Sequence, residues 1–214
     1  MIDQLKIYAC DENLRVSLQE RLLAHDVSTF SATSLRRAAV TLLIVEDSQG
    51  EASIILTRRP KTLRQHSGQY ALPGGKLEDS ENAIQAALRE THEEVGVELD
   101  ESSVLGVMDD YQTRSGFCIT PVVVWSGPNT LLKPDPNEVA LVFHIPFWDL
   151  ASPDIPQLQD SVDSSHPVLS APLQTVGHEV YAPTAAIMYQ FREIAIFGRS
   201  TRVAHFDQPN FARK

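Results

Sequence analysis

Long apolar runs are missing from this chain, and so are other features that mark membrane and secreted proteins. No apolar stretch approaches the roughly 18 residues that a membrane-spanning helix needs, so a membrane protein is not expected. The first residues show no basic segment followed by an apolar core, so a secretory signal is not expected either. The two cysteines, Cys10 and Cys118, are too few and too far apart for a disulfide framework. Together these absences favour a cytoplasmic protein with two free thiols.

Positive charge is also scarce. The chain has 18 Lys and Arg against 28 Asp and Glu, and duplex nucleic acid needs a basic face, so we expect no nucleic-acid partner. Neither an internal repeat nor a clear linker divides the 214 residues, of which 43% are hydrophobic, enough to bury a core. We expect one domain over residues 1–214, and the sequence leaves its oligomeric state open, a homodimer included.

Hydrophobic periodicity indicates a mixed α/β protein. Residues 12–25 carry leucines at helical spacing, which predicts an amphipathic N-terminal helix. Residues 37–46 and 53–59 alternate or run apolar like two strands joined by a turn. Further elements are expected along the rest of the chain: strands at 104–111, 117–125, 139–145 and 176–181, helices at 147–150 and 184–197, and an irregular loop at 152–172, which is dense in Pro, Ser and Asp.

The most informative segment runs from Gly75 to Val97 and reads GKLEDSENAIQAALRETHEEVGV. At about 100° per residue, a helix over this segment gathers an apolar or neutral stripe that would dock on a core. The stripe consists of Ile84, Ala87, Leu88, Thr91 and Val95. Glu90, Glu93 and Glu94 fall together on the opposite side, because residues three and four apart are neighbours on a helix.

Local signals set the ends of this helix. Ser80 is the expected N-cap, and Gly96 is the expected stop after the last turn. Upstream, Leu72-Pro73-Gly74-Gly75 predicts a strand that ends in a tight loop.

Three glutamates on one helix face repel one another and need neutralisation. Only Arg89 is available inside the segment, where it could pair with Glu93 or fold back towards Glu81. A hard divalent cation would balance the remaining charge, since Mg²⁺ binds carboxylates together with substrate phosphate oxygens. A solvated acidic face is the alternative for an acidic run of this kind, but the full spacing with both glycines favours the metal site.

The spacing resembles the Nudix box, Gly-x5-Glu-x7-Arg-Glu-U-x-Glu-Glu-x-Gly-U, where U is a bulky aliphatic residue. The matching residues are Gly75, Glu81, Arg89, Glu90, Glu93, Glu94, Gly96 and Val97, and Thr91 stands at the first U position. The resemblance implies a Nudix α/β/α sandwich with a mixed β-sheet, a core at about residues 37–150, and N-terminal and C-terminal helical extensions. It also implies hydrolysis of a nucleoside diphosphate linked to another group, with Mg²⁺ as the metal and Mn²⁺ as a second candidate.

The same resemblance assigns roles within the box. It implies that Glu90, Glu93 and Glu94 are metal ligands with a catalytic role. Glu81, Arg89 and Gly96 would instead shape the loop and the helix; these are structural roles.

A second group of candidate site residues, rich in positive charge, lies just before the box, in residues 54–75. Its cations are Arg58, Arg59, Lys61 and Arg64, accompanied by His66, with no acidic residue among them. Phosphate groups are suitable ligands, since Arg guanidinium binds them bidentately. An exposed basic loop that counters the acidic surface is the alternative.

This segment looks like the additional motif of the coenzyme A pyrophosphatase branch of the Nudix family. The matching residues are Leu56, Thr57, Arg59, Arg64, Gly68 and Pro73-Gly74-Gly75, with Ile55 in place of a Leu. Pro60 stands where Ser or Ala is typical, and Leu72 where an aromatic residue is typical. The resemblance implies that this segment helps form the substrate pocket and that coenzyme A or an acyl-coenzyme A is the substrate. The 3′-phosphate of coenzyme A would account for the extra cations.

Several residues have roles that the sequence leaves open. Glu138 precedes a strand where related enzymes often place a functional carboxylate, so it either joins the site or lies exposed. His66 is a phosphate contact or a loop hydrogen bonder, and His92 is structural or exposed. The group that takes the proton from the attacking water is one of the box glutamates or Glu138.

Substrate binding is expected from the basic segment and the glycines. The candidate residues are Arg58, Arg59, Arg64, His66, Gly74 and Gly75; the two glycines allow close approach of the backbone because they have no Cβ. With coenzyme A the products would be 3′,5′-ADP and 4′-phosphopantetheine. One alternative is a Nudix hydrolase of ADP-ribose, another nucleotide sugar or a nucleoside triphosphate. The other is a Nudix-like sensor that binds a nucleotide without hydrolysis.

Overall fold

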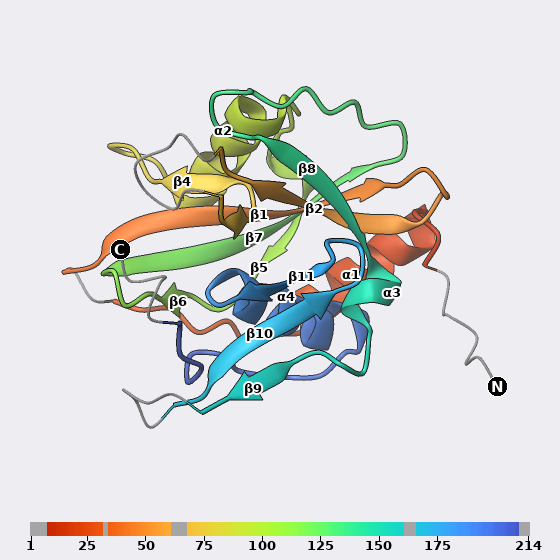
Figure 1. Cartoon of the computed structure of the whole chain (residues 1–214). Helices are drawn as coiled ribbons and strands as arrows, with labels where there is room; N and C mark the ends of the chain where they lie inside the picture. Colours follow the sequence, from red (N-terminus) through yellow and green to blue (C-terminus); the bar gives the residue numbers. More distant parts are fainter. Residues whose placement is uncertain (1–7, 32–33, 61–67, 161–165, 210–214) are drawn as a thin grey trace.

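The computed structural model describes residues 8–31, 34–60, 68–160 and 166–209 (Figure 1). No helix in these ranges combines the length and the apolar character that crossing a lipid bilayer requires. Cys10 and Cys118 are both buried and free, as the sequence predicts.

A mixed β-sheet forms the centre of the fold. Its longest strands, β1 (Arg36–Glu46) and β7 (Phe117–Gly127), run parallel and pair along almost their whole length. The other strands pair antiparallel. Strands β2 (Ala52–Arg58) and β4 (Gly74–Lys76) pair with β1. Strands β3 (Tyr70–Ala71) and β8 (Leu141–Pro146) pair with β2, whereas β5 (Val104–Val107) and β6 (Tyr111–Gln112) pair with β7. Because β2 pairs with the end of β1 and β4 with its beginning, two different segments share one edge of β1.

The helix α2 (Ala83–Val95) covers one face of this sheet. Ala39, Leu43 and Val45 point to this face at even spacing along β1, as the period of two in a strand requires. They form a core with Ala87 and Val95 of the helix, and all five side chains are almost fully buried.

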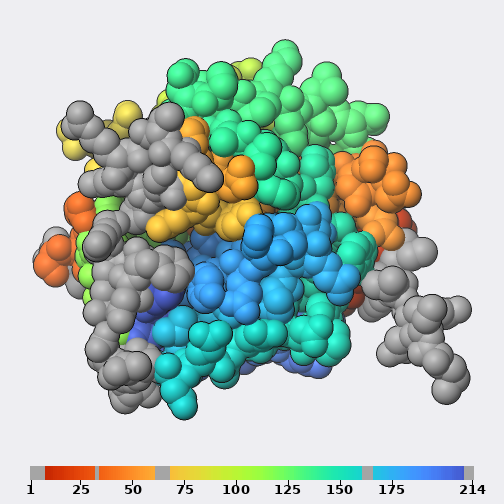
Figure 2. All heavy atoms as spheres, in the orientation of Figure 1, coloured from red at the N-terminus to blue at the C-terminus, as the bar shows by residue number. Residues whose placement is uncertain are grey.

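The opposite face carries the larger core. α1 (Glu12–Leu23), α4 (Thr184–Phe191) and a three-stranded sheet pack there. This sheet has the order β11-β10-β9 and consists of β9 (Gln157–Gln159), β10 (Val168–Leu173) and β11 (His178–Tyr181). Figure 1 shows α2 above the central sheet and the C-terminal segments, in blue, below it, and Figure 2 shows the blue segments packed in the lower half of the same view. The expected α/β/α arrangement around a mixed sheet is thus confirmed, and the small sheet adds to its lower layer.

Three short elements complete the fold. They are η1 (Glu101–Ser103), α3 (Phe147–Leu150) and η2 (Arg192–Ile196), which continues α4 as a π-helix. The expected helix at 184–197 therefore changes type near its middle. The expected strand at 104–111 is two strands, β5 and β6, and β8 begins at Leu141, two residues later than expected.

The start of α2 differs from the expectation. Asn82, not Ser80, is the N-cap: its side chain accepts a hydrogen bond from the Gln85 amide, and the Gln85 side chain accepts one from the Asn82 amide. This reciprocal pair satisfies two backbone donors, which a cap at Ser80 would not do. Gly96 ends the helix in the left-handed conformation, with φ 71°, as predicted.

Two other regions are more regular than expected. Residues 152–172 contain β9 and most of β10, because Leu169, Ala171 and Leu173 alternate towards the core among the prolines and serines. The tight loop expected at Gly74–Gly75 is instead the short strand β4, which pairs with β1.

Asp109, between β5 and β6, is a buried carboxylate that joins distant segments. Its Oδ1 accepts hydrogen bonds from the Ser28 amide at 2.9 Å and from Arg202 Nη1 at 2.6 Å, and lies 3.0 Å from His25 Nε2. Its Oδ2 accepts from Gln190 Nε2 at 2.7 Å. The segment after α1, the helix α4 and the segment after η2 are thus fastened to one side chain of the central sheet region.

Candidate active site

The glycines of β4 allow the box helix to approach the sheet closely. Gly74 and Gly75 pair with Val40 and Ala39 of β1, and α2 contacts β4. A Cβ at Gly75 would overlap the carboxylate of Glu90. A Cβ at Gly74, where φ is 155°, would overlap the backbone of β1. The fold therefore requires glycine at position 74, whereas a side chain at position 75 would displace the Glu90 carboxylate, which rests against the backbone of β4.

Glu94 lies in the interior of the protein. Its residue surface is only 3% exposed, the Gly74 amide donates to its Oε2 at 3.3 Å, and Arg59 Nη1 lies 3.6 Å from its Oε1. Burial raises the pKa of this carboxyl to about 8, although the Gly74 hydrogen bond and the Arg59 charge act in the opposite direction. The sequence places Glu94 on a face turned away from the core. That expectation is wrong, because β4 and the loop before β8 cover this side of the helix as well.

The loop before β8 brings Glu138 to the same place. The Asp135 amide donates to the Glu94 carbonyl at 3.0 Å, which fastens the loop to the last turn of α2. Burial raises the pKa of Glu90, and the charge of Glu138 adds to that rise at both Glu90 and Glu94. Glu138 therefore lies within electrostatic range of two box glutamates.

Arg89 neutralises the remaining carboxylates of the box. Its Nη1 donates to Glu90 at 3.0 Å and to Glu93 at 2.9 Å, and its Nε donates to Glu81 at 2.8 Å. Both pairings that the sequence offered, with Glu93 and with Glu81, are present at once. A further hydrogen bond to the Lys76 carbonyl, at 3.1 Å, ties Arg89 to the end of β4.

The three box glutamates do not converge in this structure. Among the residues that the structure describes, no three Asp, Glu, His or Cys side chains are grouped so that they could hold a metal ion. Arg89 holds the half-exposed Glu93 at the surface, while Glu94 is buried. The donor chemistry nevertheless fits a divalent cation: the carboxylates of Glu90 and Glu94 are hard oxygen ligands, and burial disfavours their charge.

The basic segment is divided between the two faces of the sheet. Arg59 is beside Glu94, and its buried Nε has no hydrogen-bond partner in the part of the chain that the structure describes. Arg58 pairs in register with Tyr70, whose side chain packs against the larger core, so Arg58 belongs to the face of the sheet opposite α2. Arg64 and His66, together with Lys61, lie outside the described residues.

The departure from the box at Thr91 has a structural reason. The Thr91 hydroxyl lies 2.8 Å from the Thr41 hydroxyl and 2.7 Å from the Ala87 carbonyl, and Thr41 also donates to that carbonyl at 3.0 Å. Both threonines are fully buried. A polar position on α2 is thus matched by a polar position on β1. Thr41 was missed by sequence reasoning, although it is the single polar residue within the run AAVTLLIV.

The structure also locates Leu72 and His92, two residues about which the sequence makes predictions. Leu72, where the coenzyme A motif has an aromatic residue, is 4% exposed and belongs to the larger core. Its side chain therefore packs in the interior, in contrast to the pocket position that the motif implies. His92 is exposed on α2, which agrees with one of its two expected roles.

Burial of Glu94 gives the stability of the protein a testable pH dependence. The folded pKa of about 8 exceeds the ordinary value of 4.5, so the folded state holds this proton more tightly than the unfolded chain does. The contribution of the Glu94 proton to the free energy of unfolding is fully present at low pH and is lost as the pH rises from about 4.5 to about 8. Glu94→Gln removes the ionisation. We therefore expect the variant to exceed the wild type in Tm, by more at about pH 8.5 than at about pH 5.

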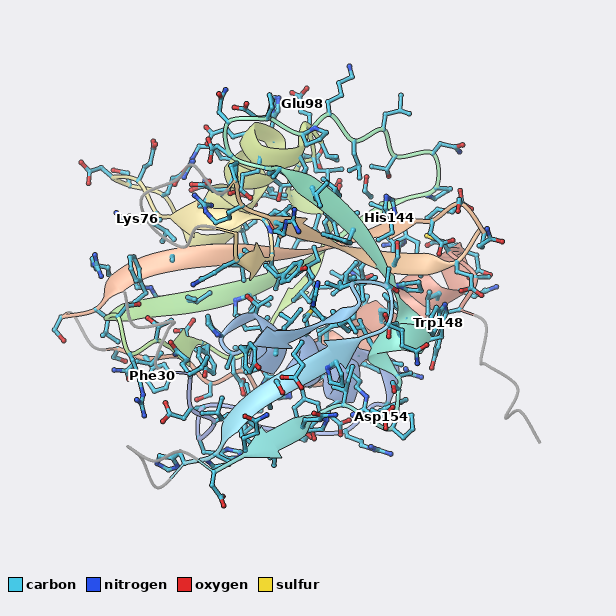
Figure 3. The ribbon with its side chains drawn as sticks, in the orientation of Figure 1. Phe30, Lys76, Glu98, His144, Trp148 and Asp154 are labelled. Atoms are coloured by element: carbon cyan, nitrogen blue, oxygen red, sulfur yellow. The ribbon has the colours of Figure 1, made fainter. Side chains whose placement is uncertain are left out.

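Thermal denaturation in EDTA, followed by circular dichroism, measures this difference. Glu98→Gln is the matched control, because Glu98 is exposed on the loop after α2 (Figure 3) and should change Tm little at either pH. The same Tm difference at both pH values would contradict the raised pKa of Glu94.

Comparison with known proteins adds to this geometry. Residues 35–165 match the NUDIX domain family. The chain is 39% identical to the Nudix hydrolase NudL of Cronobacter sakazakii over 118 residues, which cover 55% of this chain and 60% of that relative. It is 38% identical to NudL of Yersinia pestis over 140 residues, 65% of this chain and 68% of the relative. A solved structure of a putative nudix hydrolase family member from Chromobacterium violaceum covers 75% of this chain and 78% of its own, with 19% identity and a TM-score of 0.46.

Proposed function

Because the chain belongs to the Nudix family, we propose that it hydrolyses the diphosphate bond of a nucleoside diphosphate derivative with Mg²⁺ as cofactor. The observation that carries the proposal is the pair of carboxylates, Glu90 and Glu94, that lies against the β4 backbone with Glu138 nearby. Burial raises the pKa of both carboxyls, which means that their negative charge is costly at this place unless a cation accompanies it.

Glu90, Glu93 and Glu94 would hold the metal, and Mn²⁺ is the second candidate. When bound, the metal supplies a lower pKa for the attacking water and neutralises charge on the phosphoryl oxygens. The water proton passes to a carboxylate oxygen of a box glutamate or of Glu138. Arg89 would release Glu93 on metal binding, since both partners compete for the same carboxylate.

Arg59 supports the phosphate-binding part of the proposal. Its Nε is buried without a hydrogen-bond partner among the described residues, and a phosphate oxygen is a suitable acceptor. Gly74 and Gly75 support the site indirectly, because the space that their side chains would fill is taken by the backbone of β1 and by the Glu90 carboxylate.

For the substrate we propose coenzyme A or an acyl-coenzyme A, cleaved to 3′,5′-ADP and 4′-phosphopantetheine. The support is the sequence motif from Leu56 to Gly75 and its concentration of cations in an acidic chain. A 3′-phosphate is one more anion for these cations than ADP-ribose offers, and one charge-assisted hydrogen bond is worth roughly 1.5–3 kcal/mol.

The test is a hydrolysis assay with coenzyme A, dephospho-coenzyme A, ADP-ribose and NADH, each with Mg²⁺ and with Mn²⁺. We expect kcat/KM for coenzyme A to exceed that for dephospho-coenzyme A by roughly tenfold or more. EDTA should abolish turnover, and mass spectrometry should identify both products. A preference for ADP-ribose would favour a nucleotide-sugar pyrophosphatase instead. Nucleotide binding without turnover of any substrate would favour the sensor.

A further inference from the structure

Side chains at the ends of three strands gather on the face of the central sheet opposite α2. Arg58 of β2 pairs with Tyr70 of β3 and with Leu141 of β8, and directly paired residues share a face. Phe143 lies two residues beyond Leu141, so it points to the same face. The ends of β2, β3 and β8 thus present two aromatic rings and a leucine beside an arginine.

The small sheet adds a further ring to this group. His178, the first residue of β11, has its ring centroid 6.5 Å from that of Tyr70, and Tyr70 meets Phe143 edge to face at 5.7 Å. The Thr184 hydroxyl also donates to the Tyr70 carbonyl, at 3.4 Å. In Figure 2 the yellow atoms around residue 70 lie against the blue atoms of β10 and β11, which agrees with these contacts. We call Tyr70, Leu141, Phe143 and His178 the aromatic patch.

The side chains of the aromatic patch are more exposed to solvent than those of the hydrophobic core. Leu141 is 43% exposed, His178 is exposed, and Tyr70 and Phe143 are only partly buried. Within the described part of the chain, no hydrogen bond or ion pair engages the guanidinium of Arg58 beside them. Accessible rings with a few polar groups are the usual composition of a small-molecule site.

The aromatic patch adjoins the candidate active site along two segments of the chain. Arg58 directly precedes Arg59, which contacts Glu94. Tyr70 is four residues before Gly74, a separation of at most about 14 Å even in a fully extended chain. The two locations lie on opposite faces at the ends of the same strands. A ligand that extends over these strand ends would therefore contact both locations.

We propose that the aromatic patch binds the nucleobase of the substrate, with Tyr70 and His178 as the stacking residues. This inference rests on the proposed function and deepens it, since it assigns the base end of the nucleotide whose diphosphate lies at Glu94. A nucleobase offers a flat π surface that stacks on aromatic rings, whereas a ribose or a pantetheine arm does not.

Calorimetric titration with AMP and with ribose 5-phosphate, in the presence of Mg²⁺, tests the assignment. AMP carries the base and one phosphate, and ribose 5-phosphate lacks only the base. We expect AMP to bind the wild type more tightly than ribose 5-phosphate does. His178→Ala and Tyr70→Leu should each weaken AMP binding about tenfold and leave ribose 5-phosphate binding unchanged.

His205→Ala is the matched control, because His205 is also exposed but lies outside the aromatic patch, stacked on Phe206. It should bind AMP like the wild type. Unchanged AMP binding in His178→Ala and Tyr70→Leu, or an equal loss for both ligands, would overturn the assignment. His178→Ala removes only an exposed side chain, so folding is not at risk in that variant.

Binding and turnover separate this inference from the proposed function. If AMP binding depends on the aromatic patch but no diphosphate is cleaved, the nucleobase site stands and the hydrolase proposal fails. If coenzyme A or ADP-ribose is cleaved while both variants keep full AMP affinity, the hydrolase stands and the nucleobase site fails.

Discussion

Glu94→Gln should lower kcat by a factor on the order of 10²–10⁴ without unfolding the protein. The substitution keeps the shape of the side chain and its hydrogen bond from the Gly74 amide, and it removes the negative charge that a metal or a proton would neutralise. Because the Glu94 charge is buried, removing it should stabilise the folded state. The active site, however, would lose a metal ligand or a proton acceptor. Activity and stability are therefore expected to change in opposite directions.

Steady-state kinetics at saturating Mg²⁺ measure the effect on the best substrate of the hydrolysis screen. Glu98→Gln again serves as the control, since it removes one glutamate charge close to the box but outside the cluster. Near-normal Mg²⁺-dependent turnover of Glu94→Gln would show that the box is not the active site.

Gly75→Ala should have the second largest effect, a loss of about 100-fold in kcat/KM. The new Cβ would overlap the Glu90 carboxylate, so that carboxylate must shift, and a displacement of about 1 Å in a catalytic group can cost on the order of 10²-fold. Stability should change little, because the obstructing atoms are the end of a side chain and not the backbone.

Gly116→Ala separates this effect from the general cost of replacing a glycine. Gly116 has φ +83°, and no atom of the described residues lies within 4 Å of the place that a Cβ would occupy. An alanine there therefore costs left-handed backbone strain and nothing else. We expect Gly116→Ala to lower Tm and to leave kcat/KM unchanged. Full activity of Gly75→Ala would mean that the present position of Glu90 does not matter for the reaction.

The sequence predicts well those features that depend on neighbours along one element. The placement of α2 and the contact of Arg89 with Glu93 follow from helical spacing, and the end of the helix at Gly96 follows from the left-handed conformation that glycine adopts. The contact of Arg89 with Glu81, which precedes the helix, was one of the two pairings expected within the segment. The N-cap could also have been found, because Asn82 and Gln85 have the spacing of a reciprocal cap and Ser80 has no such partner.

Features that depend on several distant segments could not be predicted in this way. The burial of Glu94 arises because β4 and the loop at Asp135 close over α2, and neither segment can be placed from helical spacing. The match of Thr91 with Thr41 needs the register of α2 on β1. The interior position of Leu72 likewise depends on which face of the sheet the larger core covers.

The contacts of Asp109 extend beyond the part of the chain that matches the family. Residues 35–165 match the family, but the side chains that contact the Asp109 carboxylate include His25 and Arg202, which lie on either side of that range. A fragment trimmed to the matched range would retain the buried Asp109 carboxylate but lose the Arg202 guanidinium that pairs with it, and an unpaired buried charge is strongly destabilising. We therefore expect both flanking segments to belong to the same cooperative folding unit as the matched range, so that trimming either one should lower the stability of the catalytic region as well.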